Sequence, residues 1–213
     1  MRVLVLYGST YGHTSFIAQR IADTLSSIGH EADIANADHP AAPIGLAAYD
    51  AAVIGSSVIG GKHRRSVQRF VAAHHDELNA MPSAFFSVSA SAAGQWESQQ
   101  LDARHMLDTF LLATGWQPRT TATIAGAMSY TKYNPFVRWM MRRISKKAGG
   151  PTDTSRDHEL TDWTRVSRFV GDFITTLDVP PVQNRSPAAS RAALPTPRMR
   201  DHMVAKNMSS PAT

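Results

Sequence analysis

Residues 3–14 read VLVLYGSTYGHT, and this stretch decides the fold. Its first half is apolar, like a buried strand, and residues 15–22 that follow it have the apolar spacing of an amphipathic helix. Residues 8–14 between them are small or polar and suit a tight turn. The sequence therefore predicts a strand, a short turn and the start of a helix, one directly after the other.

A turn of this kind favours the binding of an anion. It directs free backbone N–H groups and the positive end of a helix dipole at one point, and Ser9, Thr10 and Thr14 can add hydroxyl donors. The loop has neither the lysine of a P-loop nor the glycine spacing of a dinucleotide fingerprint. Amides and hydroxyls without a cation suit the phosphate monoester of a mononucleotide such as FMN. The alternative is a plain tight turn with ordinary helix caps.

Strands and helices alternate along most of the chain. Apolar periodicity predicts strands at 2–7, 31–36, 49–55, 84–88 and 120–125, and helices at 14–28, 64–78, 99–114 and about 159–177. This alternation is typical of an α/β fold whose parallel sheet is covered on both faces. The best fit is a flavodoxin-like, doubly wound, five-stranded sheet with strand order 2-1-3-4-5 and a helical insert after the fifth strand.

Ligands of such a sheet bind beyond the carboxyl ends of the strands, where the strand order reverses. Three loops of mostly small and polar residues meet there, at 8–14, 56–63 and 89–98, and the loop after the fifth strand is close enough to join them. Small residues let a planar ring approach backbone amides closely, and Val58 and Ile59 can cover its face. We expect thirteen residues to contact FMN: Ser9, Thr10, Tyr11, Gly12, His13, Thr14, Ser57, Val58, Ile59, Gly61, Ser89, Ala90 and Ser91. The alternative is that these loops only form tight turns.

The composition excludes several classes of site. The 213 residues include no cysteine, which rules out disulfides, thiolate metal sites and cysteine nucleophiles. The nine histidines show no metal-ligand spacing, and His74 and His75 point to different faces of a helix, so we expect no metal. We also expect no signal peptide, because the chain starts with a strand, and no apolar run approaches the roughly 20 residues that span a bilayer.

The net charge of +5 is concentrated in two segments. Residues 132–147 contain six basic and no acidic residues, and residues 179–213 contain five basic residues and one acidic residue. The rest of the chain is therefore mildly acidic, which does not fit a nucleic-acid-binding surface. Residues 179–213 also hold six of the twelve prolines and lack periodicity, so we expect a disordered basic tail beyond a single domain at 1–178.

The connection at 126–157 is too long for a plain link between a strand and a helix. Asn134 and Pro135 suit the N-cap and first position of a helix that extends to residue 147. One face of this helix is apolar, with Phe136, Val137, Met140, Met141 and Ile144, and the other is mostly basic, with Arg138, Arg142, Arg143 and Lys146. Such a helix is too short to span a membrane but suits an anionic membrane surface.

One alternative interpretation of this helix remains open, and a second role is compatible with both interpretations. The helix can pack on its own domain with a solvated basic face, as most amphipathic helices do. Its arginines, Arg138, Arg142 and Arg143, can also bind the carboxylates of a substrate, because the guanidinium fork matches a carboxylate well.

Three further stretches resemble one family. They are MPSAFFSV at 81–88, IAGAMSY at 124–130, and GGPTDT at 149–154 with TDW at 161–163. The turn at 8–14 resembles the flavodoxin phosphate loop S/T-x-T-G-x-T, apart from Tyr11 in place of a small hydroxyl residue. Together these stretches are similar to the quinone-dependent protoporphyrinogen IX dehydrogenases.

The resemblance covers residues 2–177 and implies a function in haem biosynthesis. It implies FMN-dependent oxidation of protoporphyrinogen IX to protoporphyrin IX, with a membrane quinone as electron acceptor. It also implies a cytoplasmic protein that is peripherally associated with the inner face of the cell membrane. The oligomeric state is not predicted.

Two other functions on the same fold remain open. One is a flavodoxin-type electron carrier, although such carriers are usually acidic and residues 132–147 are basic. The other is an NAD(P)H-dependent quinone reductase, although the sequence has no second dinucleotide fingerprint. No residue is assigned as a catalytic base, because His63 and Tyr130 lie on suitable loops but also fit packing roles.

Overall fold

The structure, a computed structural model, describes residues 1–94, 96–147 and 149–178. The predicted tail at 179–213 lies outside the described residues. The core is a parallel sheet in the order β2-β1-β3-β5-β6. Its strands are β1 (Arg2–Gly8), β2 (Glu31–Asn36), β3 (Ala51–Ile59), β5 (Ser83–Ser89) and β6 (Thr120–Ala125). The predicted order is confirmed, since β5 and β6 are the expected fourth and fifth strands.

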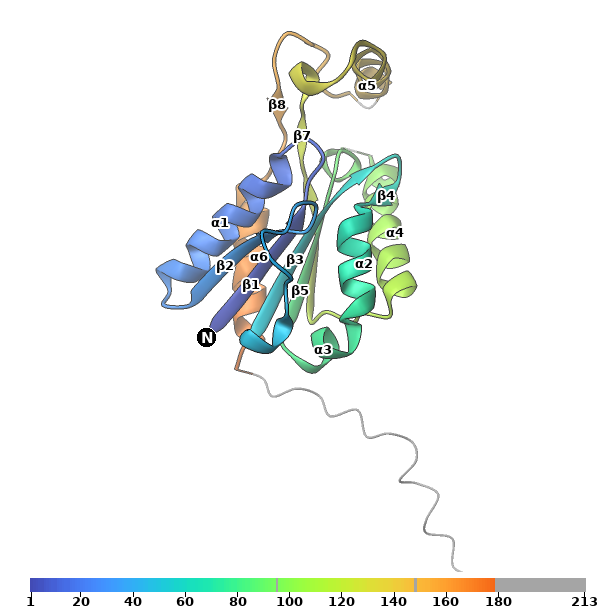
Figure 1. Cartoon of the computed structure of the whole chain (residues 1–213). Coiled ribbons are helices and arrows are strands. Elements are labelled where there is room, and N and C mark those ends of the chain that lie inside the picture. The colour runs from blue at the N-terminus through green and yellow to red at the C-terminus, as the bar shows by residue number, and fades with distance from the viewer. Residues whose placement is uncertain (95, 148, 179–213) are drawn as a thin grey trace, which may run out of the picture. The chain divides into compact units, whose positions relative to one another are not determined.

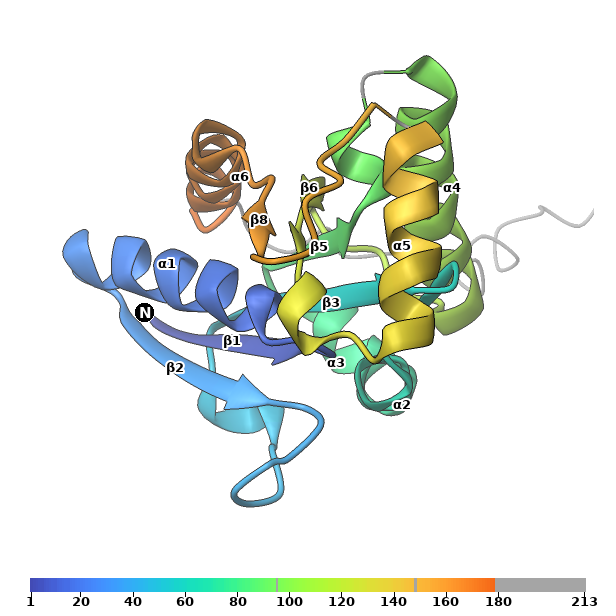
Figure 2. The ribbon, with the colours of Figure 1, turned by 90° about the horizontal axis from the view of Figure 1, so that it is seen from above.

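Helices cover both faces of the sheet (Figures 1 and 2). One face carries α1 (His13–Ser27) and α6 (Trp163–Thr175), and the other carries α2 (Arg65–Ala73), α3 (His75–Ala80) and α4 (Glu97–Thr114). Side chains of a strand alternate between faces, so Val3 and Val5 of β1 pack towards α1 and α6, whereas Leu4 and Leu6 pack towards α2 and α4. Short 3₁₀ turns, η1 (Leu46–Ala48), η2 (Ser91–Ala93) and η3 (Tyr130–Lys132), complete the connections.

The expected loop at 56–63 is a β-hairpin. β3 extends to Ile59, beyond its expected end at Gly55, and turns back into β4 (Lys62–His63). Gly60 and Gly61 form the turn with φ values of 56° and 76°, as a two-residue type I′ turn requires. The hairpin therefore extends the sheet at the edge where the ligand site was predicted.

Two predicted helix boundaries were wrong. The helix expected at 64–78 is interrupted at His74, whose ψ of 18° leaves the helical range, and continues as α3. The last helix begins at Trp163 rather than near residue 159. The Asp162 side chain accepts hydrogen bonds from the N–H groups of Thr164 and Arg165, and this cap fixes the start of α6.

The insert between β6 and α6 rises from the carboxyl edge of the sheet (Figure 1). Its base is an antiparallel pair, β7 (Ala127–Met128) with β8 (His158–Glu159), and its main helix is α5 (Pro135–Lys147). Asn134 Oδ1 accepts a hydrogen bond from the N–H of Val137 at 2.9 Å, which confirms the predicted N-cap. Seen from above, α5 crosses over the sheet on the side of α2 and α4 (Figure 2).

Candidate functional site

The phosphate loop at residues 8–14 joins β1 to α1 and leaves backbone donors free. Gly12 is the N-cap of α1 with a φ of 94°, a conformation that glycine adopts without strain. Its N–H donates to Ser9 Oγ at 2.9 Å, which closes the loop. Four backbone N–H groups of the loop have no hydrogen-bond acceptor among the described residues. They are those of Thr10, Tyr11, His13 and Thr14. These donors form a cradle for an anion.

The hydroxyl of Thr14 supports the same interpretation. Its side chain is only 1% exposed and lines a cavity at the loop. In the described part of the chain, no hydrogen-bond partner for this hydroxyl is present. The hydroxyl is therefore free to donate to a ligand that enters the cavity. A phosphate monoester offers acceptor oxygens on all sides, so the residues of the loop fit this group.

The cavity has a volume of about 80 Å³ and lies at the carboxyl ends of β1, β3 and β5. It brings together most of the predicted residues: Ser9, Thr10, Tyr11, His13, Thr14, Ser57, Val58, Ile59, Ser89 and Ala90. Gly12, Gly61 and Ser91 do not line it. Gly12 caps α1, Gly61 lies at the tip of the hairpin, and Ser91 begins η2.

Several walls of the cavity lie outside the thirteen predicted residues, although the loop after the fifth strand was expected to join the site. They come from the strand ends and the insert: Val88, Gly126, Ala127, Met128, Ser129, Tyr133 and Met141. A second cavity of about 310 Å³ shares Ala90, Met128 and Met141 with the first and extends beneath α5. The sequence held a signal for Gly126, Ala127, Met128 and Ser129, because the stretch 124–130 that contains them carries the family resemblance. No local pattern places Met141 at the site.

Two cations from other parts of the chain reach the phosphate loop. Lys132 Nζ donates to the carbonyl oxygen of Tyr11 at 2.7 Å. Arg64 Nη1 donates to Thr10 Oγ1 at 3.3 Å. The sequence predicted a phosphate site without a cation. The loop's own residues include no lysine or arginine, and the two cations come from η3 and the β4–α2 connection.

Asp38 neutralises one of these cations. Its Oδ1 lies 2.7 Å from Arg64 Nη2, and its Oδ2 accepts a hydrogen bond from the N–H of Ser9 at 3.0 Å. Burial acts to raise the pKa of Asp38, but hydrogen bonds from Arg64, Ser66 and Ser9 outweigh it and hold the pKa below its ordinary value. Asp38 is therefore ionised, and the Arg64–Asp38 pair adds no net charge.

Two histidines near the site, the half-buried His13 and the buried His63, have the charged form of the ring disfavoured. Burial lowers the pKa of His13, and it lowers the pKa of His63 to about 4. His13 Nε2 lies 2.6 Å from Thr161 Oγ1, which donates its own proton to the carbonyl of Ala125 at 2.8 Å, so His13 Nε2 carries the ring proton. His63 Nε2 lies 2.8 Å from Ser87 Oγ.

Tyr11 contacts the insert, which accounts for its departure from the usual phosphate loop. Its ring packs edge-on against Tyr133, with centroids 4.7 Å apart. The surrounding cluster includes Met128, Tyr130 and Met141. Tyr11 therefore anchors the insert to the loop. A small hydroxyl residue at this position would instead offer a hydrogen-bond donor to the ligand.

The profile of the Flavodoxin domain family matches residues 4–155 of this chain. The chain belongs to the flavodoxin family. Protoporphyrinogen IX dehydrogenase [quinone] of Escherichia coli strain K12 is 36% identical over 180 residues, which are 84% of this chain and 98% of that protein. A protein of the same name from Leishmania major is 35% identical over 185 residues, 84% of this chain and 78% of that protein. These relatives confirm the predicted family resemblance.

A solved flavodoxin confirms the fold. The crystal structure of oxidised Flavodoxin 1 from Bacillus cereus superposes with a TM-score of 0.50 at 18% identity, and covers 82% of this chain and 98% of that chain. At this identity the likeness concerns the fold alone.

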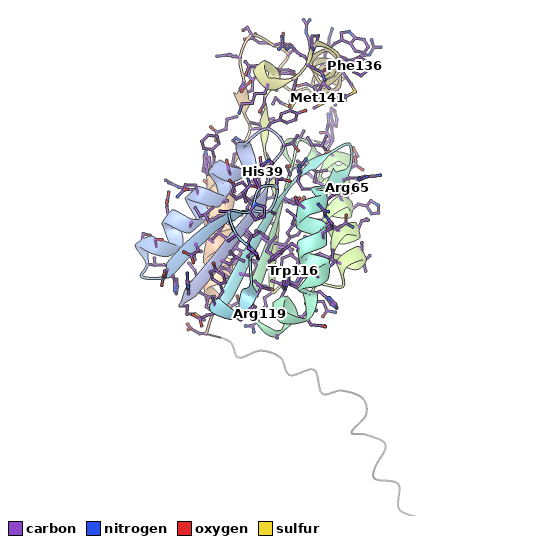
Figure 3. The ribbon with its side chains drawn as sticks, in the orientation of Figure 1. His39, Arg65, Trp116, Arg119, Phe136 and Met141 are labelled. Carbon is purple, nitrogen blue, oxygen red and sulfur yellow. The ribbon has the colours of Figure 1, made fainter. Side chains whose placement is uncertain are left out.

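The α5 helix of this flavodoxin-family chain presents two apolar surfaces, where a single apolar face was predicted. Val137 and Met141 pack inward with Tyr130 and Tyr133. On the outer side, Phe136 is 70% exposed, and Trp139 and Met140 are also exposed, whereas Ile144 is exposed but lines the cavity beneath the helix. Figure 3 shows Met141 on the side of α5 towards the sheet and Phe136 away from it. The inner surface covers the candidate site, and the outer surface faces away from the domain.

The three arginines of α5 differ in their surroundings. Arg138 donates from Nε to the carbonyl of Tyr130 at 2.9 Å and from Nη2 to that of Tyr133 at 3.1 Å, so it holds η3 against α5. Arg142 and Arg143 are exposed, and Arg143 Cζ lies 5.9 Å from the centre of the Trp139 ring. Among the described helices, none is long and apolar enough to cross a membrane.

Proposed function

We propose that this chain binds FMN at the phosphate loop and oxidises protoporphyrinogen IX, with a quinone as the electron acceptor. The observation that carries the proposal is the set of unpaired N–H donors, with the hydroxyl of Thr14, at a cavity where the three predicted loops meet. The substrate and the acceptor come from the names of the Escherichia coli and Leishmania major relatives. The same loops would suit other flavodoxin-family proteins, so the substrate is tested separately below.

The residues of the site divide the work of holding the cofactor. The free N–H groups of the loop and the hydroxyl of Thr14 hold the phosphate. Val58 and Ile59 on the hairpin and Ser89 on β5 lie where a flat ring would contact them, and Met141 approaches from α5. FMN supplies the redox chemistry by accepting two electrons and a proton, and the protein positions it and limits access of solvent.

The cavity beneath α5 is the proposed position of the tetrapyrrole. It adjoins the proposed ring site through Ala90, Met128 and Met141, and its apolar walls suit a porphyrinogen. Arg142 and Arg143 are exposed cations on the helix that covers this cavity, and guanidinium groups match the two propionates of the substrate.

Attachment to the inner face of the cell membrane through α5 is part of the same proposal. Phe136 and Trp139 are 70% and 59% exposed and contact each other, and Trp139 lies beside Arg143, a combination typical of a helix in a membrane interface. Each basic residue near an anionic surface contributes about 1 kcal/mol. A surface-bound position would bring the site close to a quinone dissolved in the bilayer.

The test is an anaerobic spectroscopic assay. Purified protein loaded with FMN is mixed with protoporphyrinogen IX or with NADPH, and menaquinone or ubiquinone is added afterwards. We expect protoporphyrinogen IX alone to bleach the flavin absorbance and quinone to restore it. Bleaching by NADPH alone would favour a quinone reductase, and bound FMN that neither compound bleaches would favour an electron carrier. Protein that takes up no flavin would overturn the proposal.

A further inference from the structure

Lys132 belongs to the insert, yet its ammonium group lies at the phosphate loop. Its Nζ donates to the carbonyl oxygen of Tyr11 at 2.7 Å, and a Cβ placed on Gly12 would lie 3.5 Å from it. The side chain therefore bonds to the carbonyl of Tyr11 and occupies the space beside Gly12.

The hydrogen bond from Lys132 fixes the peptide group between Tyr11 and Gly12. The N–H of this peptide group faces the interior of the loop. The carbonyl of Tyr11 points to Lys132, and the N–H of Gly12, in the same peptide, donates to Ser9 Oγ at 2.9 Å. The two groups point in opposite directions because a trans peptide is planar. Lys132 thus stands directly behind the loop. From there it polarises the peptide towards the interior and adds a full positive charge nearby.

Among the described residues, the ammonium group of Lys132 has acidic neighbours but no direct ion-pair partner. In the parts of the chain that the structure describes, Lys132 forms no ion pair, whereas Arg64 is paired with Asp38. Lys132 acts to lower the pKa of Asp157, whose Oδ1 accepts hydrogen bonds from the N–H and hydroxyl of Thr131, and both residues line a surface pocket that also contains Glu159. The loop therefore has one cation outside a direct ion pair, and a phosphate dianion is a ligand that complements it.

We infer that Lys132 is a positioning residue that makes the site select the phosphate monoester of FMN over uncharged riboflavin. The inference rests on the proposed flavin site and adds to it. The insert, besides covering the ring, supplies the charge that the loop itself lacks. Tyr11 supports this arrangement, because its ring packs against Tyr133, the residue next to Lys132.

The experiment compares two flavins that differ only in the phosphate. Dissociation constants of FMN and riboflavin are measured by flavin fluorescence for the wild-type chain, Lys132→Met and Lys132→Arg. Lys146→Met is the control, because it removes an exposed lysine from the same insert. We expect Lys132→Met to weaken FMN about tenfold, as the loss of one charge-assisted interaction does, and to leave riboflavin within about twofold. Lys132→Arg should recover most of the affinity, and Lys146→Met should bind both flavins like the wild type.

A second measurement isolates the phosphate. Inorganic phosphate added to the flavin-free protein should raise the midpoint of thermal unfolding more for the wild type than for Lys132→Met. The inference is overturned if Lys132→Met weakens FMN and riboflavin by the same factor, or if it leaves FMN unchanged. If the wild type binds neither flavin, the proposed function itself fails and the inference with it, so the two failures are distinguishable.

Discussion

Gly55, in the middle of β3, is opposite Phe86 of β5 and leaves room for its ring. A Cβ at Gly55 would overlap the ring of Phe86, which is fully buried and cannot turn away. We expect Gly55→Ala to lower the free energy of unfolding by about 1–3 kcal/mol, as overpacking of a core does. Urea denaturation measures this loss.

Gly171 provides the matched control for this substitution. It lies within α6, and no atom is near the position of an added Cβ. Gly171→Ala should raise the free energy of unfolding by up to about 1 kcal/mol, since alanine favours a helix more than glycine. If both variants changed stability equally, the ring of Phe86 would not be the cause.

His63 makes the stability of the domain depend on pH. Its pKa is about 4 in the folded protein, because burial disfavours the charged ring, against about 6.5 when unfolded. Well above pH 6.5 the His63 ring is neutral in both the folded and the unfolded state, so the free energy of unfolding is at its highest with respect to this group. As the pH falls from 6.5 to 4, the unfolded state gains a proton first, so roughly 3 kcal/mol is lost.

Replacing His63 by glutamine removes this titration and retains a hydrogen-bonding group towards Ser87. Urea denaturation at pH 7.5 and pH 5 should show a smaller difference for His63→Gln than for the wild type. His13, whose pKa is also lowered by burial, keeps part of the dependence in both proteins. An equal pH dependence in the two proteins would contradict the assignment.

At the scale of elements, the outer face of α5 has a testable role. We expect Arg142→Glu with Arg143→Glu to reduce co-sedimentation with anionic vesicles, because two attractive charges become repulsive. Arg138 is left unchanged, since it holds the carbonyls of Tyr130 and Tyr133. The control carries two reversals elsewhere, Arg69→Glu and Arg168→Glu, at exposed positions on α2 and α6. Equal loss in both variants would indicate a general charge effect instead.

Local patterns were sufficient for most elements. β2 and β6 have the bounds that their apolar runs predicted, and the order of the sheet followed from the alternation of strands and helices. The start of α6 was misplaced because periodicity extends past the cap, although Asp162 carried the local signal. The hairpin at 56–63 was missed because Gly60 and Gly61 were interpreted as loop residues rather than as a turn between two strands.

The sequence predicted only those residues of the candidate site that lie in loops directly after the strands of the sheet. The three loops follow strands, so their positions at the carboxyl edge follow from the topology. Lys132 and Met141 reach the same site from an insert that begins beyond the last strand, and Arg64 reaches it after the hairpin. Contacts between such distant segments depend on how the insert folds back, which periodicity and composition do not encode.

At the scale of the whole molecule, the phosphate loop and the insert form one connected structure. Tyr11 packs against Tyr133 and accepts a hydrogen bond from Lys132, and His13 lies 2.6 Å from Thr161 on the returning segment of the insert. A ligand that orders the loop therefore acts on the insert as well. The proposed cofactor and the proposed membrane helix are linked through these contacts.

We therefore expect FMN to slow amide hydrogen exchange in the insert as well as in the loop. Exchange measured by mass spectrometry should fall at residues 9–14 and at 127–137 when FMN is added, because binding stabilises every segment that must open together. Tyr11→Ser restores the small hydroxyl residue usual in flavodoxins and removes the ring contact with Tyr133. In this variant FMN should still protect the loop, while protection of the insert should shrink. Protection confined to the loop in the wild type would show that the insert moves independently of the cofactor.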